Sequence, residues 1–156
     1  MLNHPKVARD VMVTKLVTLA PGMDVHEAID MLLRNKISGA PVVDEERNFL
    51  GVFSEQCCIR VLIDSIYDQL PTTEIRAFLD TSPDSVTEDT GILTIIQIFK
   101  DTSRRRLPVL RDGKIVGQIS RRDILRTASS LLNFDPEDEA RLLYLSALRE
   151  LGDAPV

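Results

Sequence analysis

Ser120 and Asp123, in the stretch GQISRRD at residues 117–123, are the side chains of this sequence best suited to ligand chemistry. Ser120 stands where an apolar alternation gives way to a predicted helix. A helix start presents unpaired N–H groups and the positive end of the helix dipole, which suit a phosphate. Asp123 follows one turn later on the same face, and its two oxygens can accept hydrogen bonds from both hydroxyls of a ribose. The same spacing is also an ordinary helix-capping pattern, and the two interpretations are compatible.

Three consecutive arginines, Arg104, Arg105 and Arg106, form a positive cluster in a chain of net charge −5. Side chains alternate along a strand, so we expect 104 and 106 to face one way and 105 the other. Arg121 and Arg122 place like charge at the positive end of a helix dipole, a conflict that an anion would relieve. The alternative is a solvated basic turn that pairs with nearby acids.

Composition excludes several functional classes for these 156 residues. The net negative charge disfavours a nucleic-acid partner, and no apolar run approaches the ~20 residues that membrane insertion needs. The N-terminus lacks an apolar signal core, so we expect a cytoplasmic protein. Cys57 and Cys58 are adjacent, and neither they nor the two histidines have the spacing of a metal site. No nucleophile elbow or phosphate-binding loop is present, so the sequence predicts no enzyme.

A repeat organises the chain: residues 16–59 align with residues 83–125. In this alignment Pro41 matches Pro108, and Gly51 matches Gly117. Each copy predicts the order β-α-β-β-α, with the last helix at about 55–67 or 121–132. The proline in each middle strand indicates an edge or a strand start. Asp24 is a candidate cap for the first amphipathic helix.

Three segments follow from the repeat: 1–69 with the first copy and its lead-in, 70–134 with the second copy, and 135–156 as a helical tail. Asp135 is a candidate N-cap of the tail, and Pro136 suits its first turn. The apolar stripe of this tail is expected to dock on the same chain or to form a dimer contact.

With these residues in hand, the sequence resembles a tandem pair of CBS domains, also called a Bateman module, over residues 7 to about 132. The markers are ISGAPVVD and RRRLPVLRDG, the Gly-x-x-Ser strand ends, and the Ser-x-x-Asp helix start. The resemblance implies a mixed α+β fold. In it, two β-α-β-β-α repeats pack through their sheets with pseudo-twofold symmetry, with the C-terminal helix added. It also implies two clefts that in many members bind adenosyl ligands, and a disc-shaped homodimer.

Comparison of the two copies within this resemblance predicts one competent site per chain, centred on the second copy, with a first-copy cleft that fails as a nucleotide site or takes something smaller. Asp123 would bind the ribose, with Ser120 and the arginines of residues 104–106 near the phosphates. The first copy has Cys57 in place of the ribose acid, and Glu55 lies at the wrong helical angle. The remaining predicted contacts are Gln118, Arg122, Leu107 and Pro108 from the second copy, and Met23 and Ser54 from the first.

The predicted function is a non-catalytic regulatory module that binds AMP, ADP, ATP or S-adenosylmethionine and signals energy or metabolite state to a partner. No cofactor is required in this interpretation. We expect a homodimer that acts on a regulated protein in trans. The alternative is a structural dimer or adaptor that binds no ligand.

Overall fold

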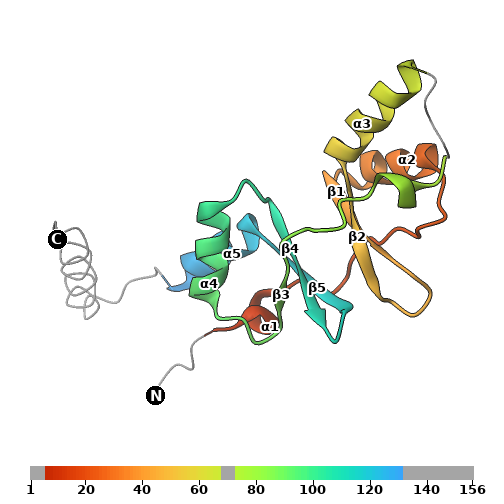
Figure 1. The fold of residues 1–156 in the computed structure, drawn as a ribbon. Coiled ribbons are helices and arrows are strands. Elements are labelled where there is room, and N and C mark those ends of the chain that lie inside the picture. Colours follow the sequence, from red (N-terminus) through yellow and green to blue (C-terminus); the bar gives the residue numbers. More distant parts are fainter. Residues whose placement is uncertain (1–5, 68–72, 132–156) are drawn as a thin grey trace, which may run out of the picture. The chain divides into compact units, whose positions relative to one another are not determined.

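The structure is a computed structural model that describes residues 6–67 and 73–131. The chain divides into two compact units, Met1–Ile124 and Leu125–Val156. The first unit contains every described strand (Figure 1). The predicted tail helix at 135–153 lies outside the described residues.

The first repeat follows the predicted order of elements. Its lead-in carries the short helix α1 (Ala8–Val11), and its first extended segment makes one parallel bridge, Leu19 to Val42. The elements that follow are α2 (Val25–Asn35), β1 (Gly39–Val43), β2 (Phe49–Ser54) and α3 (Glu55–Ile66).

The second repeat has the same order, introduced by a 3-10 helix, η1 (Ile75–Phe78). Its elements are β3 (Val86–Thr87), α4 (Ile92–Asp101), β4 (Arg106–Arg111), β5 (Lys114–Ser120) and α5 (Arg121–Leu131). In both copies the two long strands form an antiparallel hairpin, and β3 adds a parallel edge to β4. The predicted α+β fold of two tandem repeats is confirmed.

Local sequence explains why α2 begins and ends where it does. Asp24 accepts a hydrogen bond from the amide of His26 at 2.8 Å, which confirms the predicted N-cap. Val25, Ala28 and Leu32 recur at helical spacing and are buried. Lys36 ends the helix in the left-handed conformation, with φ of 53°.

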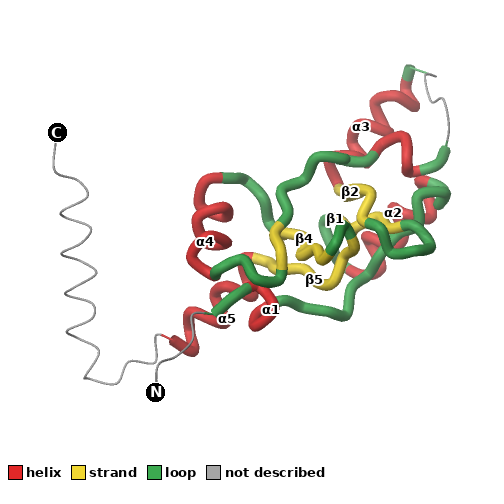
Figure 2. Tube along the Cα trace, turned by 60° about the horizontal axis from the view of Figure 1, so that its bottom comes forward, coloured by secondary structure: helices red, strands yellow, loops and turns green. Residues whose placement is uncertain are grey.

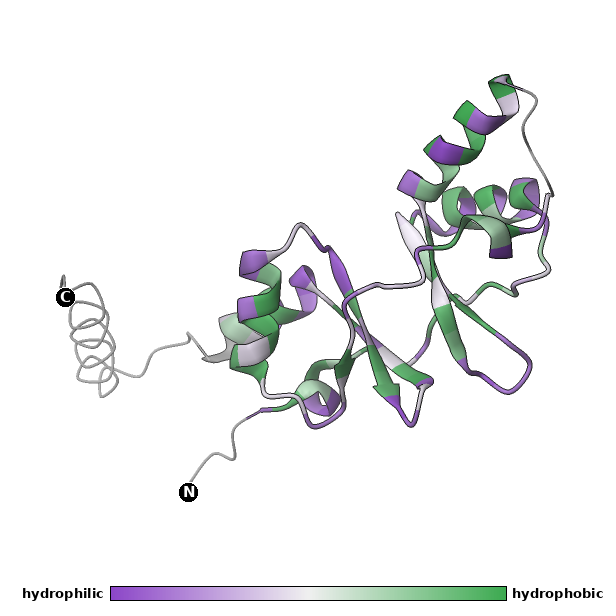
Figure 3. Ribbon diagram, viewed as in Figure 1, coloured by the Kyte–Doolittle hydropathy of each residue, from purple (hydrophilic) through white to green (hydrophobic). Residues whose placement is uncertain are grey.

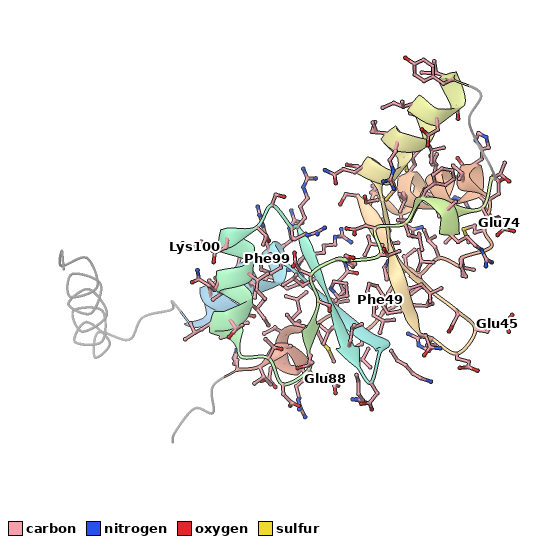
Figure 4. All side chains as sticks on the ribbon, viewed as in Figure 1. Glu45, Phe49, Glu74, Glu88, Phe99 and Lys100 are labelled. Carbon is pink, nitrogen blue, oxygen red and sulfur yellow. The ribbon has the colours of Figure 1, made fainter. Side chains whose placement is uncertain are left out.

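Each repeat has its own apolar core, visible as the hydrophobic faces of helices and strands in Figure 3. Phe53 and Ile75 are fully buried in the first core, and Ile95 and Leu107 are fully buried in the second. The hairpin of the second repeat reaches the start of β2 at its turn (Figures 2 and 4). There the amide of Phe49 donates a hydrogen bond to the carbonyl of Gly113 at 3.0 Å.

The repeats exchange their lead-in segments. Val13, ahead of the first repeat, forms two backbone hydrogen bonds of 2.9 and 3.0 Å with Gln118 of β5. Asp80, ahead of the second repeat, forms two bonds of 2.9 Å with Val52 of β2. The lead-in of each copy therefore pairs with the hairpin of the other copy, as expected for two repeats related by pseudo-twofold symmetry.

Both strand prolines lie inside paired strands, and β4 is the central strand of its sheet, which corrects the expected edge or strand start. Their missing N–H groups make this exchange possible. Pro41 lies opposite Val52, and Pro108 lies opposite Gln118. Opposed residues of an antiparallel pair exchange either both backbone hydrogen bonds or neither, and proline has no N–H to donate. The partner residue is thus free to turn its N–H and C=O toward the other repeat's lead-in.

Glycines at the crossing points provide the necessary space. Gly51 has φ of +151°, and a Cβ there would collide with the carbonyl oxygen of Asp80 and lie 3.2 Å from its carbon. A Cβ at Gly117 would lie 2.5 Å from the sulfur of Met12. Gly51 thus allows the backbone of the crossing segment to approach, whereas a larger residue at Gly117 would require the Met12 side chain to move.

Gly51→Ala is expected to lower the free energy of unfolding by about 2–3 kcal/mol, through backbone strain and the collision with Asp80. Urea unfolding measures this change. Gly91→Ala is the matched control, since nothing lies within 4 Å of a Cβ at that position. Equal losses in the two variants would contradict the crossing constraint.

Candidate functional site

A cavity of about 840 Å³ lies between the two repeats. Its lining comes from three places: the β1–β2 hairpin with the start of α3, the segment Leu79–Asp84, and the residues around the start of β4. The lining includes Ser38, Ala40, Pro41, Val52, Ser54, Glu55, Gln56, Cys57, Arg60, Leu79, Asp80, Asp84, Arg104, Arg105, Arg106, Pro108 and Gln118.

The start of α3 forms one wall of this cavity. Ser54 is its N-cap residue by position, but its side chain makes no capping hydrogen bond to the helix. The Ser54 hydroxyl instead lies 3.5 Å from the sulfur of Cys57, which in turn lies 3.7 Å from the carbonyl oxygen of Val52. The amide of Glu55 donates to Ser38 at 2.9 Å. The positive end of α3 therefore borders the cavity without a side-chain cap.

The arginine cluster forms the opposite wall. Arg104 is held by two carboxylates: its Nη1 lies 3.0 Å from Asp80, and its Nε lies 3.0 Å from Asp84. These hydrogen bonds, first that of Asp80 and then that of Asp84, raise the pKa of the Arg104 guanidinium. Among the described residues, no acid forms an ion pair with Arg105 or Arg106.

All three arginines belong to the lining of the cavity. The expected alternation of their side chains does not apply to them. The alternation presupposed a strand through residues 104–106, but β4 begins only at Arg106. The two preceding residues lie in the connection from α4, where the rule for strands does not apply. Pairing with acids, one of the two interpretations of this cluster, therefore applies to Arg104. Arg105 and Arg106 line the cavity without an ion pair to a described acid.

Ser120 and Asp123 form a reciprocal capping box. The Asp123 carboxylate accepts from the Ser120 amide and hydroxyl, each at 2.7 Å. The Asp123 amide donates back to the Ser120 hydroxyl at 3.2 Å. The capping interpretation is thus confirmed, and neither residue belongs to the lining of the cavity. Their contact with a nucleotide stays a prediction.

The other predicted contacts divide in the same way. Ser54, Pro108 and Gln118 line the cavity together with the arginines. Leu107 is fully buried in the second core, and Met23 packs against the first core. Arg122 is exposed on α5 and, like Leu107 and Met23, is not part of the lining.

Arg121 has a partner that the sequence did not indicate. Its guanidinium donates to the carbonyls of Thr102 at 3.1 Å and Phe99 at 3.4 Å, at the end of α4. These carbonyls are the negative end of the α4 dipole. The charge that Arg121 brings to the start of α5 is therefore offset by the end of a neighbouring helix.

Sequence reasoning missed Arg60, Asp80 and Asp84. Arg60 lies one turn beyond Cys57, so helical periodicity from the start of α3 could have indicated it. Asp80 and Asp84 lie in the lead-in of the second copy, and their place in the cavity depends on the exchange of lead-ins. No spacing rule within one repeat reveals that exchange.

The described residues include no cluster of metal-ligating side chains and no helix long and apolar enough to cross a membrane. Cys57 and Cys58 are both free thiols. Burial, with a smaller contribution from Cys57, raises the pKa of the Cys58 thiol, so that it stays protonated at neutral pH.

Comparison with known proteins agrees with the repeat. The CBS domain matches this chain twice, at residues 8–64 and 75–130. The chain belongs to the CBS domain family. Its relatives include the uncharacterized protein MJ1225 of Methanocaldococcus jannaschii, 29% identical over 136 residues. Another is the inosine-5'-monophosphate dehydrogenase of Aquifex aeolicus, 33% identical over 124 residues. The matches cover 83% and 78% of this chain but only 44% and 24% of those proteins.

Solved CBS-pair structures share the fold. CBSX2 in complex with AMP is 25% identical and has a TM-score of 0.72, covering 80% of this chain and 97% of that one. The CBS pair of MJ0100, in complex with 5'-methylthioadenosine and S-adenosylmethionine, is 19% identical with a TM-score of 0.66. The match covers 81% of this chain and 98% of the MJ0100 pair.

The capping box yields a stability prediction. Asp123→Ala is expected to lower the free energy of unfolding by about 1 kcal/mol, because it removes the cap of α5. Ser54→Ala is the matched control at the start of α3, where no capping bond is lost, and is expected to change stability by less than about 0.5 kcal/mol. Urea denaturation followed by circular dichroism compares the two. A larger loss for Ser54→Ala would show that the caps are assigned to the wrong helix.

Proposed function

We propose that this CBS pair is a non-catalytic regulatory module that binds an adenine nucleotide in the cavity between its repeats. One observation carries the proposal. The uncapped start of α3 and the arginines Arg105 and Arg106, which no described acid neutralises, border the same cavity. Helix amides and guanidinium groups are the two kinds of donor that bind phosphate best.

The rest of the lining suits the nucleoside. Ala40, Pro41, Val52, Leu79 and Pro108 offer apolar surface for a planar base. Polar side chains of Ser54, Gln56 and Gln118 can bind ribose hydroxyls or base edges. A volume of about 840 Å³ falls within the usual range of small-molecule sites, about 300–1,000 Å³.

The AMP complex of CBSX2 supports this ligand class, because that protein shares both the fold and a quarter of the sequence. S-adenosylmethionine remains the alternative adenosyl ligand. In the proposed module, occupancy would act on a partner in trans by favouring one of two states of the protein. The shift can be no larger than the ligand's differential affinity for those states.

Binding is tested by isothermal titration with AMP, ADP, ATP and S-adenosylmethionine. Removing two guanidinium groups from a phosphate site is expected to weaken nucleotide binding by about tenfold or more in the Arg105→Ala/Arg106→Ala double variant. Arg34→Ala removes one exposed arginine of α2 outside the cavity; it is the surface control and is expected to bind like the wild type.

Asp123→Ala distinguishes the two places where a nucleotide could bind. Binding in the cavity predicts nearly wild-type affinity for this variant and a large loss for the double arginine variant. Binding centred on the α5 cap, as expected from the sequence, predicts a large loss of affinity for Asp123→Ala as well, because that site combines Asp123 with the arginines. Absence of binding by the wild type at millimolar concentration would contradict nucleotide sensing and favour the adaptor.

A homodimer is part of the same proposal, supported by an apolar face on α3 (Figure 3). Ile59, Leu62, Ile63 and Ile66 follow helical spacing and are between 50% and 77% exposed. Such a stripe on a short helix usually marks an interface. The ligand-free adaptor would use this face as well, so a dimer alone does not decide between the two functions.

Ile63→Asp is expected to convert the dimer to a monomer, because a carboxylate would be desolvated at the centre of the stripe. Light scattering after size-exclusion chromatography measures the mass. His26→Glu, an exposed substitution on α2, is the control and should leave the mass unchanged. A dimer that persists in Ile63→Asp would place the interface elsewhere.

A further inference from the structure

Within the proposed nucleotide cavity, one arginine is already neutralised. Arg104 contacts Asp80 and Asp84 at 3.0 Å each, and all three residues belong to the lining. The whole lining contains four arginines and three acids, one positive charge in excess. Most of the charge that would attract a phosphate is thus offset by carboxylates of the cavity itself.

The two acids are fixed by different means. Asp80 is anchored through its backbone, because its N–H and its C=O both form hydrogen bonds with Val52 of β2. Its second carboxylate oxygen, Oδ1, accepts from the amide of Ser82 at 3.1 Å. Asp84 is 48% exposed, and its carboxylate contacts the Nε of Arg104 at 3.0 Å. The carboxylate of Asp80 thus has one contact, with the Ser82 amide, that does not involve Arg104.

The ion pairs are weak enough to be exchanged. Arg104, Asp80 and Asp84 are between 36% and 48% exposed, and ion pairs of that exposure contribute little to stability. A phosphate that reaches Arg104 can replace a carboxylate as its partner. The displaced carboxylate then lies beside the phosphate, and the two negative groups repel each other.

We propose that Asp80 and Asp84 are specificity-determining residues that make the cavity prefer a nucleoside monophosphate to a di- or triphosphate. This inference rests on the proposed nucleotide site. A monophosphate carries nearly two negative charges at neutral pH, which Arg105 and Arg106 can match. Each further phosphate extends to Arg104 and meets the two carboxylates.

The test compares affinities for AMP and ATP by isothermal titration, in EDTA so that no divalent cation offsets the added charge. The wild type is expected to bind AMP more tightly than ATP. In Asp84→Asn, ATP binding is expected to strengthen by about fivefold to tenfold and AMP binding by less than about twofold, because only the longer ligand meets this carboxylate.

Two further variants sharpen the result. Arg104→Ala leaves Asp80 and Asp84 without their partner, and is expected to weaken ATP more than AMP. Asp89→Asn is the matched control, because Asp89 also pairs with an arginine, Arg9, but lies outside the cavity. Its ratio of ATP to AMP affinity should equal that of the wild type. If Asp84→Asn folds poorly, as judged by circular dichroism, Asp80→Asn provides the same comparison.

The outcomes separate this inference from the proposed function. If the wild type binds nucleotides but Asp84→Asn and Asp80→Asn leave the ATP-to-AMP ratio unchanged, the specificity role is wrong and the nucleotide site stands. A wild type that prefers ATP would also overturn it. If the wild type binds none of these nucleotides, the proposed function and the inference fail together.

Discussion

The structure depends on the close crossing of each repeat's hairpin by the lead-in of the other. Backbone pairs at Val13–Gln118 and Val52–Asp80 join the copies, and the glycines Gly51 and Gly117 leave room for the crossing segments. The crossing at Val52 carries Asp80 and Asp84 to the start of α3, where one repeat alone could not place them. The cavity is therefore a product of the tandem arrangement, and its charge balance comes from both copies.

The Ser-x-x-Asp motif at the start of α5 and the equivalent Ser-x-x-Cys at the start of α3 show how one residue changes a helix start. In the second copy, Asp123 and Ser120 satisfy each other and close the start of α5. In the first copy, Cys57 replaces the acid, its buried thiol contacts Ser54, and the start of α3 lacks a side-chain cap. Under the proposed function, loss of the carboxylate changes what the start of α3 offers a ligand, from an acceptor for hydroxyl groups to donors for an anion.

Much of the fold could be predicted because local sequence patterns within each repeat indicate its helices and strands. Helical spacing placed α2 and α4, and Asp24 marked a helix start, but the prolines expected at an edge or a strand start lie inside paired strands. The site was predicted less well. The arginines and Ser54 were found, but their partners Asp80 and Asp84 depend on contacts between copies that are distant in sequence. Arg121 was misjudged for the same reason, because the carbonyls it binds belong to another helix.

Mapping amide chemical shifts by NMR during titration with AMP tests the central claim most directly, because it locates the ligand without altering the protein. The account predicts that the largest changes fall on the start of α3, on residues 80–84 and on residues 104–106, which surround the cavity. Changes confined to Ser120–Asp123 and the facing lead-in at Val13 would contradict it, and would place the ligand at the α5 cap instead.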